Sequence, residues 1–458
     1  MSTMSTRQTA RNIARRNLRL ESLERRELLA GNVQASVIGS KLFLTGDNLD
    51  NNIAVVALGG GRYAVAGLDT TVNGSNGVFV TPRPVAHLSA NLNAGNDGLG
   101  LTNNAQALFD LADALFIDLE AQLGVDAATL QLAIDAATSV DDFSLSGSLT
   151  VAGGAGDDVV AVIGNIGGSV VVSLGTATTM GGNIFGIDGQ SLMGGTGMVG
   201  GGISVVGDSQ SDNVLVAAMK VRGSVSAALG AGDNSLSIGG SMIDGGVSVT
   251  GGMDTDRSFL HSSNIGGHVS IAPGQGDNLI TIGGIGETTV GSLAVSTGAG
   301  RDMALVSGKV RNGVSIWTGA GADSVTIAQD NSGPASIGGN LVIDTGSGND
   351  SVTVQANVRQ SLVIGLGDGN DSLEFLGMVV GFNASIDAGN GDDRVMIAQS
   401  NIGYFLYLFA GSGDDNVAII TSDARAAYLF GGLGNDDLDV DAATLAAVDF
   451  LFRSEFEA

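Results

Sequence analysis

The chain has 458 residues with 73 Gly, 4 Pro and no Cys, and its 20 basic and 47 acidic residues give a formal net charge of -27. This Gly and Asp excess is typical of turns, which argues against a large helical or α/β enzyme. The 43% hydrophobic content excludes disorder, the acidity argues against nucleic-acid binding, and no apolar stretch is long enough for a membrane span.

Residues 1–30 form a basic segment at the start of an otherwise acidic chain. No apolar run follows the Arg residues, as it would in a secretory signal. The string Leu20-Glu21-Ser22-Leu23-Glu24-Arg25-Arg26-Glu27-Leu28-Leu29-Ala30 resembles the LEPR-XLL element that opens many large exported or surface repeat proteins of planctomycete type, although Arg25 stands where that element has Pro. The resemblance implies an export or targeting segment and an extracellular or cell-surface location. The basic residues are Arg7, Arg11, Arg15, Arg16, Arg19, Arg25 and Arg26.

Two different sections follow. Residues 31–102 are predicted to be an opening β section, because 46–55 and 92–97 resemble degenerate copies of a turn that recurs later in the chain. Residues 103–140 are predicted to be helical, since Leu recurs there at helical spacing and Gly124 ends the first helix. We expect this helical segment to be a cap or insertion of the β structure, with an interaction helix as the alternative.

Residues 141–440 carry an internal repeat of about 22 residues, with the recurring string Gly-x-Gly-(Asp/Asn)-Asp-x-apolar-x-apolar. A clear copy is Gly346-Ser347-Gly348-Asn349-Asp350-Ser351-Val352-Thr353-Val354. We call the second acidic position of each copy the register residue. The gap between the first two register residues has room for one degenerate coil or a long insertion. The register residues are Asp158, Asp212, Asn234, Asp256, Asn278, Asp302, Asp323, Asp350, Asp371, Asp393, Asp415 and Asp436.

Apolar residues keep the same register on both sides of this turn. The fourth residue after each register residue is apolar in every copy, and so are the seventh and ninth residues before it. Each copy therefore predicts two short strands with period-2 alternation, and a further apolar residue suggests a short third wall. Because one such unit cannot bury its strands alone, the units must stack. The predicted fold is all-β, a parallel β-helix (β-solenoid) of roughly 12–14 coils and about 60–65 Å in length at about 4.8 Å per coil.

Two further segments depart from the repeat. Residues 175–202 are rich in Gly and carry only Asp188 as a charge, which predicts an irregular or long coil, with a binding loop as the alternative. Residues 441–458 break the coil pattern and are predicted to cap the last coil.

The turn motif resembles the RTX (hemolysin-type) repeat G-G-x-G-x-D-x-U-x. Residues 153–161 and 431–439 match it at every fixed position. In that family the turns of stacked coils bind Ca²⁺ through Gly carbonyls and Asp, and the proteins are exported. This chain departs from the family in carrying one copy per 22-residue coil in place of tandem copies, so only one edge is expected to carry ions.

In-register stacking brings the turn carboxylates within about 5 Å of one another, where neighbouring charges repel by about 1 kcal/mol even in water. Such a ladder is tolerated if its carboxylates extend into solvent or if cations neutralise it, and Ca²⁺ takes oxygen ligands of this kind. The alternative is that Asp and Asn are present only as good turn formers. The predicted metal-binding residues are Asp157, Asp158, Asp302, Asp323, Asp350, Asp371, Asp392, Asp393, Asp414, Asp415 and Asp436.

The predicted function is that of an exported or cell-surface structural rod that binds Ca²⁺ along one edge. One alternative is an adhesin, or a module that binds carbohydrate or matrix polysaccharide. Another is a polysaccharide lyase or hydrolase of the parallel β-helix type. We expect no enzyme, because the Asp pairs are equivalent turn residues and the regular repeat persists to the end of the chain.

Overall fold

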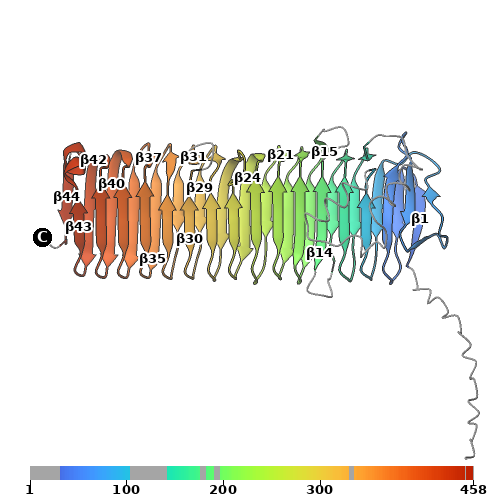
Figure 1. Ribbon diagram of the computed structural model, residues 1–458, viewed down its shortest axis with the longest axis horizontal. Helices are drawn as coiled ribbons and strands as arrows, with labels where there is room; N and C mark the ends of the chain where they lie inside the picture. Colours follow the sequence, from blue (N-terminus) through green and yellow to red (C-terminus); the bar gives the residue numbers. More distant parts are fainter. Residues whose placement is uncertain are drawn as a thin grey trace, which may run out of the picture.

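The protein is a straight rod of stacked β coils in the computed structural model, which describes residues 31–103, 142–175, 182–189, 196–329, 335–448 and 450–456 (Figure 1). The coils run from one end of the rod to the other in sequence order. The parallel β-solenoid has about 13 turns of about 22 residues each, which confirms the predicted fold class.

Each coil has three walls, and the first consists of the strands that precede the Gly-rich turn. These strands pair in parallel with the same residues of the next coil, for example Leu362 with Ala384 and Ile364 with Ile386. The first wall consists of β2 (Lys41–Thr45), β7 (His87–Asn91), β10 (Leu149–Ala152), β13 (Val170–Ser173), β16 (Ile203–Asp208), β19 (Val225–Gly230), β22 (Val247–Thr250), β24 (Asn264–Gly274), β26 (Thr289–Thr297), β29 (Val314–Trp317), β32 (Leu341–Asp344), β35 (Leu362–Asp368), β38 (Ala384–Asn390), β40 (Asn401–Ser412), β42 (Asp423–Leu433) and β44 (Phe450–Ser454).

The second wall follows the turn and forms a separate parallel ladder. Its alternating sequence sends every second side chain into the coil, and β-branched residues dominate these positions. The second wall consists of β3 (Asn52–Ala57), β8 (Gly98–Leu101), β11 (Val159–Ile163), β14 (Asn183–Asp188), β17 (Asp212–Ala217), β20 (Ser235–Gly239), β23 (Arg257–His261), β25 (Leu279–Ile282), β27 (Met303–Val306), β30 (Ser324–Ile327), β33 (Ser351–Val354), β36 (Ser372–Leu376), β39 (Arg394–Ala398), β41 (Asn416–Ile420) and β43 (Asp437–Val440).

The third wall is short, and the labels of β15, β21, β31 and β37 mark it along the upper edge of the rod in Figure 1. In β24, β26, β40 and β42 it continues into the first wall as one strand. Its strands confirm the predicted third wall. They are β9 (Ser144–Leu145), β12 (Asn165–Ile166), β15 (Gly197–Val199), β18 (Met219–Val221), β21 (Met242–Ile243), β28 (Lys309–Val310), β31 (Ala335–Ile337), β34 (Ala356–Val358) and β37 (Val379–Val380).

The core is one continuous column of aliphatic side chains along the rod axis. Val216, Ile238 and Leu260 follow one another in successive coils of the second wall, and each is fully buried. Ser258, two residues after the register residue Asp256, stands where the other coils carry an apolar residue, and it is also buried. Since every coil contributes a thin layer, Val, Ile and Leu fill it without bulky aromatic residues.

The two ends of the rod differ. At the N-terminal end, antiparallel strands continue past the first coil, with β1 (Asn32–Ile38) beside β2 and β4 (Tyr63–Gly67) beside β3. Two short strands, β5 (Thr71–Val72) and β6 (Phe79–Val80), lie beyond them. These strands cover the edges of the first coil.

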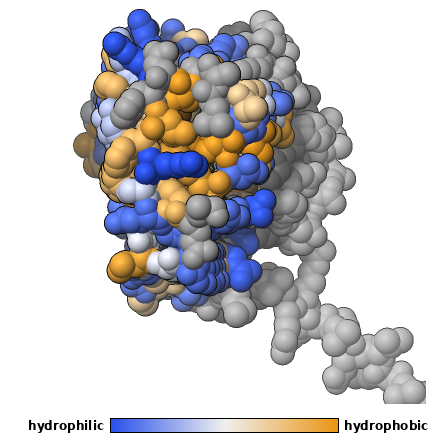
Figure 2. Space-filling view, turned by 90° about the vertical axis from the view of Figure 1, so that its left-hand side faces the viewer, coloured by the Kyte–Doolittle hydropathy of each residue, from blue (hydrophilic) through white to orange (hydrophobic). Residues whose placement is uncertain are grey.

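At the C-terminal end, the short helix α4 (Ala442–Ala447) and β44 follow the last coil. Asp441 caps α4 by accepting the N–H of Thr444 at 2.8 Å. Leu438 and Val440 of β43 are only half-buried, whereas Val417 and Ile419 one coil earlier are fully buried. Figure 2 looks onto this end and shows apolar residues gathered in the middle of the end face.

Three predicted segments fall wholly or partly outside the described residues. The basic segment 1–30 and nearly all of the helical segment 103–140 lie outside them. Within 175–202 the structure describes β14 and β15, and Asn183 of β14 occupies the place of a register residue. The long gap between Asp158 and Asp212 therefore contains one degenerate coil. In the described part of the chain no helix is long and apolar enough to cross a membrane.

Candidate functional site: a buried ladder of aspartate and asparagine

The register residues form a ladder inside the rod, directly beneath the Gly-rich turns. We call this set the inner ladder. It contains the predicted register residues and three more, Asn51, Asp97 and Asn183. Every member is buried, with an exposed fraction of 5% or less. The inner ladder comprises Asn51, Asp97, Asp158, Asn183, Asp212, Asn234, Asp256, Asn278, Asp302, Asp323, Asp350, Asp371, Asp393, Asp415 and Asp436.

Backbone-to-side-chain hydrogen bonds connect the inner ladder from coil to coil. The N–H of Asp371 donates to Oδ1 of Asp393 at 2.8 Å, and the N–H of Asp393 donates to Oδ1 of Asp415 at 2.9 Å. The same bond recurs along the rod with lengths of 2.7–3.1 Å. Asn183 is the exception, because its N–H donates to the carbonyl of Ser211. The ladder thus satisfies turn N–H groups that the sheet hydrogen bonds do not reach.

The second carboxylate oxygen is buried without a hydrogen-bond partner at most Asp positions. This holds for Oδ2 of Asp97, Asp158, Asp302, Asp323, Asp350, Asp371, Asp393, Asp415 and Asp436. In the two remaining Asp coils Oδ2 accepts a backbone N–H, that of Asp208 at Asp212 and that of Gly252 at Asp256. Burying a carboxylate oxygen without a partner costs free energy, so these positions favour protonation of the carboxyl or a bound cation.

The Asn coils show what surrounds this second position. The amide NH₂ of Asn234 donates to the carbonyls of Gly230 at 3.2 Å and Gly232 at 2.9 Å. The amide of Asn278 likewise donates to the carbonyls of Gly274 at 3.3 Å and Gly276 at 2.9 Å. The register of the ladder gives Oδ2 of an Asp coil the place of this amide group. In these two Asn coils the position is therefore lined by carbonyl oxygens, which attract a positive charge or a hydrogen-bond donor. In the Asp212 and Asp256 coils a backbone N–H reaches it.

Burial raises the pKa of nine inner-ladder carboxyls, those of Asp97, Asp158, Asp212, Asp256, Asp302, Asp350, Asp371, Asp393 and Asp415. Desolvation is the largest cause in each case, and it raises the pKa of Asp158 and Asp393 to about 7 and that of Asp350 to about 6. The hydrogen bond from the backbone N–H of the neighbouring coil opposes this shift, and the charge of neighbouring carboxylates adds to it. The pKa values of Asp97, Asp212 and Asp415 also rise to about 6.

These shifts predict that the metal-free protein becomes less stable as the pH rises. A carboxyl whose pKa is higher in the folded state binds more protons when folded, so the free energy of unfolding falls between about pH 4 and pH 7 and levels off above. The hydrogen bonds with Thr444 lower the pKa of Asp441 to about 2. This carboxyl therefore makes the free energy of unfolding rise with pH, but only below about pH 4. Urea unfolding in EGTA at pH 5 and pH 8 measures the effect. Equal stability at both values would contradict it.

The exposed acidic residues of the turns form a second, outer ladder. The N–H of Asp414 donates to Oδ1 of Asp392 at 2.9 Å, and the N–H of Asn435 donates to Oδ1 of Asp414 at 2.9 Å. The N–H of Asp157 donates to Oδ1 of Asn96 at 3.0 Å. The outer ladder thus runs in the opposite hydrogen-bonding direction to the inner one, and its side chains lie on the solvent side of the turn.

The structure therefore separates the predicted metal-binding residues into two sets. Asp157, Asp392 and Asp414 lie in the outer ladder, and all the others lie in the inner ladder. The alternative in which the register carboxylates extend into solvent does not hold, because they are buried. The sequence contained the signal for this: the second and fourth residues after each register residue face the core, and period 2 gives the register residue the same side.

No three His, Cys, Asp or Glu side chains in the described ranges converge into a cluster that could hold a metal ion. Each Asp coil contributes a single inner carboxylate, and the Asn coils contribute none. A cation at the inner ladder would therefore need backbone carbonyls as well as carboxylates of successive coils.

An outward-facing aromatic surface near the C-terminal end was not predicted. The chain has 15 Phe, 4 Tyr and 1 Trp, and half of these residues lie in 382–456. Tyr407 and Tyr428 stack with ring centroids 5.1 Å apart, and Phe409 and Phe430 with centroids 4.9 Å apart. The signal in the sequence was the aromatic residue at the same outward position of successive coils.

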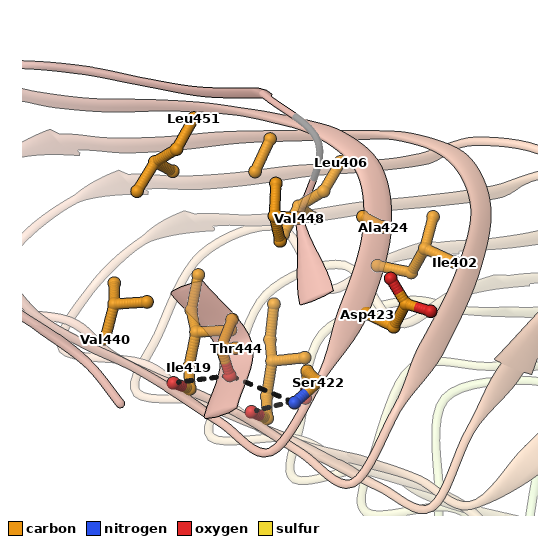
Figure 3. A pocket seen from close by; sticks show the side chains of 12 residues that line it. Ile402, Leu406, Ile419, Ser422, Asp423, Ala424, Val440, Thr444, Val448 and Leu451 are labelled. Carbon is orange, nitrogen blue, oxygen red and sulfur yellow. Dashed lines mark hydrogen bonds between the residues drawn. The ribbon is translucent and has the colours of Figure 1, made fainter. Parts of the chain in front are cut away.

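The hollow at the C-terminal end does not resemble a ligand site (Figure 3). Ile402, Leu406, Val440 and Leu451 line it, and its free volume is about 10 Å³, at the lower limit for one water molecule. Beside it the hydroxyl of Thr444 accepts the N–H of Ser422 at 3.0 Å and donates to the carbonyl of Ile419 at 3.3 Å. The same arrangement occurs one coil earlier, where the N–H of Ser400 donates to the hydroxyl of Ser422 at 3.2 Å.

Comparison with known proteins identifies no relative: no protein family, curated protein or solved structure matches the chain. The candidate site therefore rests on the geometry of the ladder and on the sequence motif.

Proposed function

We propose that the chain is an exported or cell-surface structural rod whose inner ladder takes up Ca²⁺. The observation that carries this proposal is the row of buried Oδ2 atoms without partners, which continues through seven successive coils. These are the coils of Asp302, Asp323, Asp350, Asp371, Asp393, Asp415 and Asp436.

The donor set at these coils suits Ca²⁺. Carboxylate and carbonyl oxygens are the ligands that Ca²⁺ prefers, and it accepts six to eight of them in flexible geometry. In the Asn234 and Asn278 coils the amide NH₂ at this position donates to carbonyls of the turn. The corresponding carbonyls of the Asp coils are the further ligands that this proposal requires. A bound cation would neutralise the ladder and favour the folded state over the unfolded chain.

A regular rod of this kind has a structural use that needs no enzymatic cleft. Its length is set by the number of coils, and each added coil lengthens it by about 4.8 Å. Because Ca²⁺ binds the folded rod in this proposal, its free energy of unfolding is high in a calcium-rich exterior and lower where calcium is scarce.

Calcium addition is expected to raise the melting temperature of the EGTA-treated protein. The ladder variant Asp350→Asn/Asp371→Asn/Asp393→Asn should lose much of this response, because its amide groups donate to the carbonyls in place of the cation. The matched variant Asp387→Asn/Asp392→Asn/Asp414→Asn removes three exposed charges from the Asp393 coil and the coil that follows it, and it should retain the response. An unchanged melting temperature at millimolar Ca²⁺ would refute the calcium part of the proposal.

A second candidate function is carbohydrate binding by an adhesin, and the aromatic surface favours it. Phe382, Tyr404 and Phe409 are at least 40% exposed on the outer side of the last coils. Exposed aromatic groups of this extent on a soluble protein usually mark an interaction surface. Retention on immobilised polysaccharides tests this function, with Tyr407→Ala expected to weaken it and Ser385→Ala, the same position one coil earlier, as the control. No retention on any polysaccharide would refute it.

A further inference from the structure

The charges on the surface of the rod are separated onto two opposite edges. The Gly-rich turns form one edge, and the third wall forms the other at the far ends of the long strands (Figure 1). The acidic edge carries Asp157, Asp208, Asp233, Asp254, Asp277, Asp368, Asp392 and Asp414. Against them stand Arg301 within the turns and Arg257 and Arg394 directly after them, at the start of β23 and β39. The basic edge carries Lys220, Arg222, Lys309, Arg311, Arg359 and Arg425 against Asp244, Glu287 and Asp423.

Most of the basic side chains have no carboxylate partner within the chain. Lys309 and Glu287, at 2.6 Å, form the one ion pair between residues that the structure describes. Arg222, Arg359 and Arg425 are exposed and take part in no ion pair there. The chain has 47 acidic residues, so a shortage of carboxylates does not explain the lack of ion pairs. The explanation is that the width of the coil lies between these guanidinium groups and the acidic turns.

The two edges also share one spacing. On each edge the charges lie whole numbers of coils apart, in four coils on the basic edge and in eight on the acidic edge. A cation on one rod therefore meets a carboxylate on the other at several relative positions of two rods. Many weak pairs that form together hold far more strongly than a single surface pair, which contributes at most about 1 kcal/mol.

We propose that copies of this chain associate side by side, with the basic edge of one rod against the acidic edge of the next. This inference rests on the proposed structural role of the rod and is independent of calcium. The contact joins two different surfaces of the same chain, so it leaves one free edge of each kind and continues into a layer of rods. The partner is a second copy, because another rod carries the complementary charges at the same whole-coil spacings.

Sedimentation velocity of the full chain in EGTA tests the association. At about 10 mM salt, where the screening length is about 30 Å, we expect species larger than the monomer, and at about 1 M, where it is about 3 Å, the monomer alone. Arg222→Glu/Arg359→Glu/Arg425→Glu should abolish association at low salt. Arg257→Glu/Arg394→Glu, which changes exposed charges on the second wall, should leave it unchanged.

Mixing two variants gives the decisive result. The basic-edge variant above has two acidic edges, and Asp368→Lys/Asp392→Lys/Asp414→Lys has two basic edges over the last coils. Each should stay monomeric alone, and the mixture should associate. A monomeric wild-type chain at low salt, or association that survives in the basic-edge variant, would overturn the inference. The calcium response of the melting temperature is measured on the monomer at high salt and is judged separately.

Discussion

Replacing Asp393 by Asn is expected to raise the free energy of unfolding by about 1–2 kcal/mol at pH 8 without calcium, whereas Asp393→Ala should lower it by about 1–3 kcal/mol. The Asn variant keeps the oxygen that accepts the N–H of Asp371 and adds an NH₂ group where Oδ2 has no partner. The Ala variant leaves that N–H buried without an acceptor. Urea unfolding followed by circular dichroism measures both changes.

The pH dependence separates this explanation from a general effect of the substitution. Because burial raises the pKa of Asp393 to about 7, its carboxyl carries a proton at pH 5 and already resembles the amide. The advantage of Asn should therefore shrink between pH 8 and pH 5, while the cost of Ala should remain. An Asn variant that is less stable than the wild-type chain at pH 8 would contradict the assignment of Oδ2 to a position lined by carbonyls.

Gly369→Ala is expected to lower the free energy of unfolding by about 3 kcal/mol or more. The residue has a φ of +140°, which only Gly adopts readily, and this conformation alone costs another residue about 1–3 kcal/mol. A Cβ atom would also lie 1.7 Å from the carbonyl oxygen of Gly348 in the preceding coil. The stacked turns would have to separate, which weakens the hydrogen bonds of the ladder beside them.

Two neighbouring glycines provide matched controls. A Cβ atom added to Gly365 would meet no other atom within 4 Å, and the residue has no positive φ, so Gly365→Ala should be neutral or stabilise by about 0.5 kcal/mol. Gly377 has a φ of +64° but open space around it, so Gly377→Ala isolates the backbone cost at about 1 kcal/mol. Equal losses at Gly369 and Gly377 would show that close stacking of the turns contributes little.

Most of the fold followed from periodicity. Val354, Phe375 and Ile397 hold the same place relative to their register residues, and each is buried in the second wall as predicted. Every coil of a parallel solenoid has the same local structure, so residues at the same position of the sequence repeat also stack on one another in the fold. The sequence pattern did not identify Asn183 as a register residue, because the sequence on either side of its coil does not follow the repeat.

The candidate site was located in sequence but its environment was not. Register spacing identified Asp350, Asp371 and Asp393 as stacked neighbours, and they are joined by hydrogen bonds of 2.7 and 2.8 Å. Period 2 gives these residues the core side, but the motif did not reveal that they are fully closed off from solvent and that one oxygen of each lacks a partner. Burial depends on the atoms of the coils above and below, which a single repeat does not contain.

The sequence by itself determined the coil length, the inward column of aliphatic residues and the line of acidic turns, because each is a property of one repeat copied along the chain. Only the tertiary structure decided that Oδ2 of Asp393 is buried without a partner, and that Arg359 lies across the coil from the acidic edge. The physical reason is that desolvation and charge separation arise when coils close and stack, and they depend on distances through space that the order of residues does not specify.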